Sequence, residues 1–169
     1  QLQSSAASDV YKRQVGNYEY GFFWYFNLDG SIKLEIKLTG ILTTRAHIDG
    51  DDLAFARQVA PIVAGPIHQH IFCVRLDMAV DGRVNKVVEV NTEALPQGKD
   101  NPYGTAFAAR ETVLSNEESG MRETNSASSR YWRVESSEER NRLGRPTAYR
   151  LLPASTATMF ASADSPHAK

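Results

Sequence analysis

The chain has 169 residues, a length typical of one domain. Its 19 Lys and Arg residues nearly balance 20 Asp and Glu residues, so a net charge of −1 gives no electrostatic reason to expect nucleic acid or an anionic membrane as a partner. No apolar run approaches the roughly 20 residues of a membrane-spanning helix, and a single cysteine, Cys73, excludes an internal disulfide. The hydrophobic content of 41% is typical of a globular protein.

The first 14 residues differ from the rest of the chain. They are polar, show no apolar periodicity and lack the basic start and apolar core of a secretory signal. We expect residues 1–14 to form a leader that is disordered or foreign to the fold. The folded part is then expected to begin at Val15.

Two segments near the start of the folded part predict a β-hairpin. Residues 18–27 form an aromatic run, and apolar and polar residues alternate from Ile32 to Thr39. Such alternation is typical of a strand with one buried and one solvated face. Asp29-Gly30 lies between the two segments and is a strong hairpin-turn dipeptide. Residues 48–66 follow as a long connection.

A second hairpin is predicted over residues 67–91, with its first strand at 68–79, a turn at Asp81-Gly82 and a return strand at 84–91. No segment shows a convincing helical period. The predicted class is therefore all-β, an antiparallel β-sandwich. The remaining expectations are an irregular loop at 94–106, shorter strands at 107–114 and 130–135, and polar connections at 115–129 and 136–147.

The sequence His68-Gln69-His70 is a candidate metal site. On a strand, residues i and i+2 point to the same face, so both imidazoles would reach one ion. Imidazole suits Cu, Zn, Fe and Ni, so the pair does not choose the metal, and chance occurrence is an equally simple interpretation. Tyr18, taken by itself, is a tyrosine near a strand start whose ordinary role is packing.

These residues together carry a resemblance to a known family. Val-Gly-Asn-Tyr-Glu-Tyr-Gly at 15–21 resembles the Asn-Tyr-Asp/Glu-Asn/Tyr signature of the copper amine oxidases, the topaquinone-containing primary-amine oxidases. The match continues through 22–42, and the His-Gln-His motif follows where the family places two of its three copper ligands. Arg-Leu-Asp-Met at 75–78 and Tyr-Gly-Thr-Ala-Phe at 103–107 also match.

The resemblance implies a role for individual residues. Tyr18 matches the tyrosine that copper and O₂ convert to topaquinone, the electrophile that a primary amine attacks to give a Schiff base. Asn17 matches the neighbour that orients the quinone, and His68 and His70 match two Cu(II) ligands. Asp77 and the backbone carbonyl of Met78 match ligands of a peripheral cation of the Ca, Na or Mn type. The implied reaction turns a primary amine, O₂ and water into an aldehyde, ammonia and hydrogen peroxide.

The resemblance also implies what this chain does not contain. The family's catalytic Asp lies upstream of the quinone tyrosine and its third copper histidine lies downstream of the region matched here. We therefore expect residues 15–169 to be an internal piece of the C-terminal catalytic supersandwich domain, inactive by itself, from an enzyme that is a homodimer. The absence of Asn-x-Ser/Thr sequons and of a second cysteine favours a cytoplasmic microbial enzyme.

Two other function classes remain open from the residues alone. One is a non-catalytic, cupin-like metal-binding β-domain that uses His68 and His70, with Glu89 or Glu93 as a further ligand. The other is a structural β-module in which Tyr18 is a packing residue and the histidine pair is incidental. A quinone dependent on Tyr18 separates the oxidase from both.

Overall fold

The computed structural model describes residues 5–48, 50, 53–153 and 158–166. The chain divides into two compact units at His70, and each unit is described by itself. Almost all regular structure in the described residues is antiparallel β, which confirms the predicted fold class. The exceptions are two single helical turns, α1 (Glu117–Gly120) and η1 (Ser126–Ser128). None of the described residues forms a helix long and apolar enough to cross a membrane.

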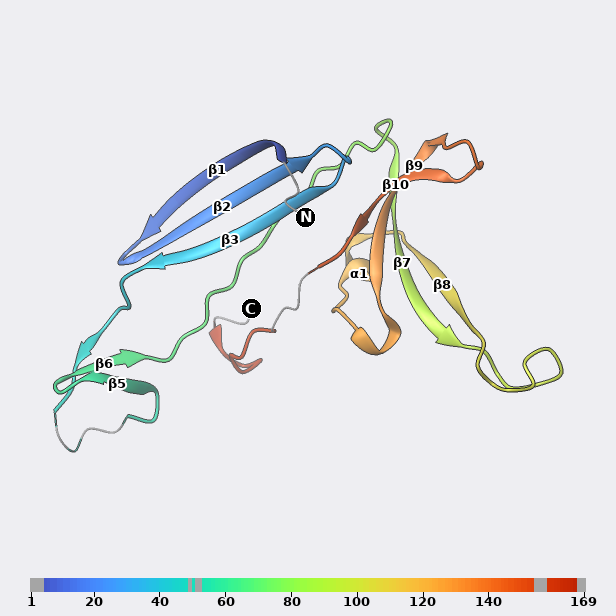
Figure 1. Cartoon of the computed structure of the whole chain (residues 1–169). Helices are drawn as coiled ribbons and strands as arrows, with labels where there is room; N and C mark the ends of the chain where they lie inside the picture. Colours follow the sequence, from blue (N-terminus) through green and yellow to red (C-terminus); the bar gives the residue numbers. More distant parts are fainter. Residues whose placement is uncertain (1–4, 49, 51–52, 154–157, 167–169) are drawn as a thin grey trace. The chain divides into compact units, whose positions relative to one another are not determined.

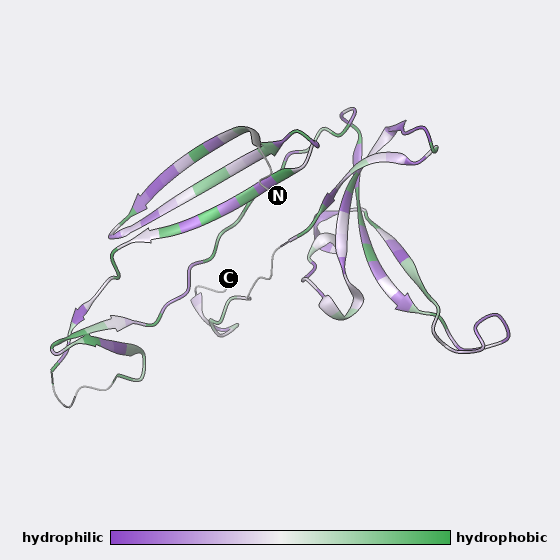
Figure 2. Ribbon diagram, in the orientation of Figure 1, coloured by the Kyte–Doolittle hydropathy of each residue, from purple (hydrophilic) through white to green (hydrophobic). Residues whose placement is uncertain are grey.

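The first unit is built around a three-stranded antiparallel sheet of order β1-β2-β3 (Figure 1). Its strands are β1 (Ser5–Val15), β2 (Tyr18–Asn27) and β3 (Ile32–Gly40). Strands β2 and β3 confirm the predicted first hairpin, and Figure 2 shows the alternation of apolar and polar residues along β3. Gly30 has a positive φ of 81°, and its N–H donates to the carbonyl of Asn27, so the turn closes where the sequence predicts it.

Residues 5–14, predicted to be part of a disordered or foreign leader, are not disordered, because they form most of β1. This strand pairs with β2 in a register that sets Val15 opposite Tyr18. The two residues between them, Gly16 and Asn17, form a tight hairpin turn in which Gly16 takes a φ of 59°. A polar strand is stable here because the backbone of β2 supplies its hydrogen-bond partners. Residues 1–4 lie outside the described part of the chain.

A small second sheet completes the first unit. Its strands have the order β4-β6-β5 and are β4 (Arg45–Ala46), β5 (Ala56–Ala60) and β6 (Val63–Pro66). The predicted plain connection at 48–66 therefore contains a hairpin, β5–β6. After β6 the backbone N–H of Ile67 donates to the carbonyl of Phe55, which holds the start of the segment that carries the histidine pair.

The second unit is a four-stranded antiparallel sheet of order β10-β9-β7-β8. Its strands are β7 (Asn85–Ala94), β8 (Phe107–Leu114), β9 (Tyr131–Arg140) and β10 (Pro146–Leu151). Val88 and Val90 are buried on β7, and Glu89 between them is buried as well. The carboxylate of Glu89 lies 3.3 Å from Nε of Arg122 and 3.6 Å from Nε of Arg130, so its buried charge is paired.

The second hairpin is only partly as predicted. Its return strand exists as β7, and the turn residues Asp81 and Gly82 both have positive φ, 42° and 127°. The predicted first strand at 68–79 is wrong, because β7 pairs with β8 and β9 and no described residue in 68–79 belongs to a strand. An apolar segment forms a strand only where a neighbour offers its backbone, and β8 and β9 occupy both edges of β7.

The later expectations hold with shifted ends. The predicted strand at 107–114 coincides with β8, and the loop before it is tied together by the side chain of Asn101, which donates to the carbonyls of Leu95 and Pro96. The strand expected at 130–135 extends to Arg140. The region predicted as a connection at 136–147 therefore begins within β9 and ends within β10.

Candidate active site

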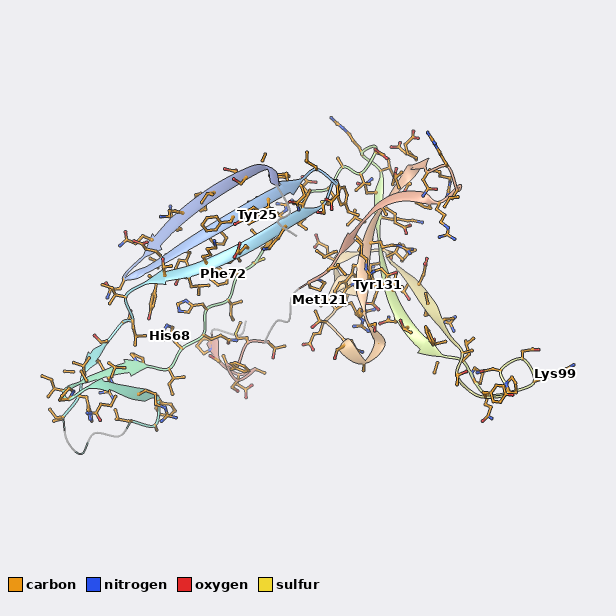
Figure 3. The ribbon with its side chains drawn as sticks, viewed as in Figure 1. Tyr25, His68, Phe72, Lys99, Met121 and Tyr131 are labelled. Carbon is orange, nitrogen blue, oxygen red and sulfur yellow. The ribbon has the colours of Figure 1, made fainter. Side chains whose placement is uncertain are left out.

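Three aromatic rings come together in the first unit. Tyr18 opens β2. His68, labelled in Figure 3, lies on the segment after β6, and His70 follows it two residues later. The ring centroid of Tyr18 is 5.4 Å from that of His68 and 4.9 Å from that of His70. The two histidine rings are 4.7 Å apart. The structure therefore gathers the residues that the two sequence motifs single out.

The sheet fixes Tyr18 from both sides. It is paired with Val15 on β1 and with Gly40 on β3, at the end of each hairpin register. Its hydroxyl oxygen accepts the backbone N–H of Thr43 at 3.0 Å, which sets the far end of the ring. Gly40 has a φ of 99°, and a Cβ there would lie 2.9 Å from Cα of Tyr18, closer than real side chains allow. Only glycine lets β3 approach the Tyr18 backbone this closely.

The histidine pair is oriented by hydrogen bonds. His68 Nδ1 lies 2.9 Å from the carbonyl oxygen of Pro66. A carbonyl only accepts, so Nδ1 carries a proton, and in the neutral imidazole Nε2 then keeps its lone pair. His70 Nδ1 lies 2.9 Å from the hydroxyl of Tyr20, which is two residues beyond Tyr18 on β2. The Nε2 atoms of the two histidines then face each other at 2.9 Å.

The prediction that a strand holds the pair is wrong, since both histidines follow β6 outside any strand. The hydrogen bonds to Pro66 and Tyr20 bring the rings together instead. His68 is exposed and His70 is half-buried, so the site is open to solvent within this unit.

The separation of the two Nε2 atoms suits a metal ion. Two nitrogens that bind one ion at about 2.0 Å and at a right angle lie about 2.8 Å apart, close to the 2.9 Å observed. A right angle between neighbouring ligands is the arrangement that Cu(II) prefers. Within the described ranges no group of three or more His, Cys, Asp or Glu side chains gathers around one point, so no third such side chain joins the histidine pair there.

The positions of the other predicted site residues lend less support to their predicted roles. Asn17 is exposed in the β1–β2 turn, and its carbonyl accepts the N–H of Ile41 at 2.8 Å. Asp77 is exposed and Met78 half-buried at the start of the second unit. The quinone-orienting role of Asn17 and the peripheral cation at Asp77 and Met78 stay predictions.

The cupin-like alternative loses its proposed carboxylate ligands. Glu89 is buried between two arginines, as described above, and Glu93 is hydrogen-bonded to Nε of Arg110 at 3.1 Å. Both carboxylates lie on β7 in the second unit and are engaged in ion pairs there.

Comparison with known proteins identifies the family. The family described as copper amine oxidase, enzyme domain, matches residues 12–169. The chain belongs to the copper amine oxidase family. The matched region begins at residue 12, so the last residues of the expected leader fall inside this enzyme domain.

Relatives share this copper amine oxidase sequence over most of the chain. A histamine oxidase from Arthrobacter globiformis is 43% identical over 89% of the chain. A primary amine oxidase from Arthrobacter sp. strain P1 is 41% identical over 82% of it, and a peroxisomal, copper-containing diamine oxidase from Nicotiana tabacum is 42% identical over 82%. The chain spans 22%, 21% and 18% of the lengths of these three relatives, about a fifth of each.

Solved structures of amine oxidases share this fold. A copper-containing benzylamine oxidase from Hansenula polymorpha superposes with a TM-score of 0.83 over 94% of the chain, at 27% identity, and the chain covers 25% of it. An Aspergillus nidulans amine oxidase, 20% identical, shares the fold with a TM-score of 0.74 over 93% of this chain and 22% of its own. Copper and a quinone are the cofactors that this family implies.

Three contacts that shape the site were not foreseen from the sequence. Thr43 and Pro66 act through backbone atoms, which sequence does not identify. Tyr20 had a usable signal, because residues two apart on a strand share a face and Tyr20 therefore lies on the side of Tyr18. The dipeptide Gly16-Asn17 was a further signal for the hairpin that positions Tyr18, because Gly-Asn is typical of two-residue hairpin turns.

Proposed function

We propose that this chain carries the quinone-forming tyrosine and two of the copper ligands of a primary-amine oxidase. The observation that carries the proposal is the Tyr18 ring set against a histidine pair whose two Nε2 atoms are 2.9 Å apart. A tyrosine whose only role is packing does not need two histidine rings beside its own ring. Membership in the copper amine oxidase family supports the same conclusion.

Each residue has a defined part in this proposal. His68 and His70 hold copper through Nε2, and Tyr18 is the precursor of topaquinone. Copper with O₂ supplies the redox chemistry that hydroxylation of a phenol requires and that protein side chains lack. The Thr43 N–H holds the Tyr18 hydroxyl and so limits rotation of the ring before it is modified. Asn17, the residue before Tyr18, keeps the quinone in its productive orientation.

The proposed substrates are a primary amine, O₂ and water. The amine carbon loses two electrons and becomes an aldehyde, the nitrogen leaves as ammonia, and O₂ takes up the two electrons as hydrogen peroxide. The relatives named above are a histamine oxidase, a primary amine oxidase and a diamine oxidase, so the shared chemistry is a primary amino group on a CH₂ carbon.

The complete catalyst, in this proposal, needs groups beyond those of this chain. The predicted catalytic Asp and third copper histidine complete the site in a longer polypeptide, and that polypeptide forms a homodimer. Asp77 and Met78 contribute to a peripheral cation site. Where some family members have a second aspartate, this chain has Ala79, so that site has one ligand fewer here.

The test is redox-cycling quinone staining of denatured protein after incubation with Cu(II) and air. It compares the 169-residue chain with the oxidase polypeptide that contains it. We expect a stain in the longer polypeptide that disappears in Tyr18→Phe and His68→Ala and persists in Tyr25→Phe, a tyrosine on the same strand. The 169-residue chain is expected to stain weakly or not at all. A copper-loaded longer polypeptide without stain would refute the quinone assignment.

A further inference from the structure

We propose that Tyr20 is a positioning residue for copper binding, acting through His70. This inference rests on the proposed copper site and names a residue that the family signature does not assign to the metal. Its basis is the contact of 2.9 Å between the Tyr20 hydroxyl and His70 Nδ1, together with the facing Nε2 atoms of the histidine pair.

The proton positions follow from the hydrogen bonds. His68 Nδ1 donates to the Pro66 carbonyl, so in the neutral imidazole His68 Nε2 has a lone pair and no proton. A contact of 2.9 Å between two Nε2 atoms then requires the proton of His70 to lie on its own Nε2. His70 Nδ1 is consequently an acceptor, and the Tyr20 hydroxyl donates to it.

When both Nε2 atoms bind one metal ion, the direction of the hydrogen bond between His70 and Tyr20 must reverse. His70 Nε2 must present a lone pair, so the ring proton has to be on Nδ1. The Tyr20 oxygen, at the same place, then accepts that N–H. A phenolic hydroxyl both donates and accepts, so Tyr20 serves the metal-free and the metal-bound tautomer without moving, whereas a carbonyl could serve only one.

The sheet makes Tyr20 a rigid partner. It lies on β2, the central strand, with Arg13 opposite it on β1 and Leu38 opposite it on β3. It is half-buried, so its hydroxyl is constrained by the surrounding structure. Its ring centroid is 5.6 Å from that of His70 and 6.4 Å from that of Tyr18. Tyr20 therefore links the copper ligand to the strand that carries the quinone precursor.

Tyr25 offers a matched control on the same strand. It is also half-buried, and its hydroxyl donates to Oε2 of Glu35 at 3.0 Å, away from the histidines. This hydrogen bond to Glu35 raises the pKa of Tyr25 above its ordinary value. Tyr25→Phe removes one partnered hydroxyl from β2, as Tyr20→Phe does, but leaves the histidine pair intact.

The first measurement is Cu(II) affinity of the metal-free 169-residue chain, by competition with a chelating dye, in wild type, Tyr20→Phe and Tyr25→Phe. Loss of a partner that orients a ligating histidine weakens metal binding by roughly 10- to 100-fold. We expect that loss in Tyr20→Phe and less than a two-fold change in Tyr25→Phe. Equal affinities in all three proteins, or equal losses in both variants, would overturn the inference.

The second measurement needs no variant. Two-bond ¹H–¹⁵N spectra of the His70 ring distinguish its tautomers, and Zn(II) serves as a diamagnetic substitute for copper. The proton of His70 is expected on Nε2 in the metal-free chain and on Nδ1 with Zn(II) bound. A His70 ring that keeps its proton on Nε2 in the Zn(II)-bound chain would contradict the role given to Tyr20.

His68→Ala separates this inference from the proposed copper site. If His68→Ala leaves Cu(II) affinity unchanged, the metal does not bind at the pair, and both proposals fail. If His68→Ala weakens binding while Tyr20→Phe does not, the copper site stands and only the role of Tyr20 is refuted.

Discussion

Gly40→Ala tests how the sheet holds the backbone of the quinone precursor. Gly40 ends β3 opposite Tyr18, with a φ of 99°. A Cβ at this position would clash with the carbonyl oxygen of Asn17 and would lie 2.9 Å from Cα of Tyr18 and 3.0 Å from the backbone nitrogen of Glu19. These are backbone atoms of the central strand and of the turn before it, so they cannot move aside as a flexible side chain would.

The expected destabilisation has two parts. A non-glycine residue at positive φ costs about 1–3 kcal/mol. The steric contact with β2 adds about 1–3 kcal/mol, the usual cost of overpacking. Gly30→Ala isolates the first part, because Gly30 also has a positive φ, 81°, but a Cβ there meets nothing within 4 Å. Both glycines flank the same strand, so the pair of variants is well matched.

The assay is urea unfolding followed by the fluorescence of Trp24 on β2, in a Trp132→Phe background that removes the other tryptophan. Gly40→Ala is expected to lower the free energy of unfolding by about 1–3 kcal/mol more than Gly30→Ala does. In the longer oxidase polypeptide it should also reduce the Tyr18-dependent quinone stain more than Gly30→Ala. Equal destabilisation by the two variants would show that β3 does not constrain Tyr18 through this contact.

Two further predictions concern charge. Hydrogen bonds from the side chain and backbone N–H of Ser31 lower the pKa of Asp29. The Asp29 carboxylate therefore stabilises the β2–β3 hairpin at pH values above the ordinary carboxyl range, and this stabilisation is lost as pH falls through the lowered pKa. NMR of the hairpin across acid pH should show a weaker pH dependence of hairpin stability in Asp29→Asn, and an unchanged pH profile in that variant would contradict the prediction. Glu89→Gln should destabilise the second unit by about 2–4 kcal/mol because it removes the buried carboxylate that pairs with the half-buried Arg130 and the exposed Arg122. Glu93→Gln, in an exposed pair, should cost about 0–1 kcal/mol, and similar unfolding midpoints for the two variants would refute the distinction.

The sequence by itself determined the local elements of this protein. Alternation from Ile32 to Thr39 and the Asp29-Gly30 dipeptide specify β2, β3 and their turn, because side-chain period and turn geometry are local properties. The same holds for β8 at 107–114. The motif around Tyr18 and the pair at His68 and His70 also identified the family, since those residue types carry its chemistry.

Only the tertiary structure decided which strands find partners. Residues 5–14 are polar, yet they form β1 because β2 supplies hydrogen bonds along their length. Residues 68–79 are predicted as a strand, yet they form none because β8 and β9 already flank β7. The orientation of the histidine pair likewise depends on the Pro66 carbonyl and on the Tyr20 hydroxyl, 50 residues before His70. Contacts between distant residues and backbone atoms are set by pairing in space, and no local pattern encodes them.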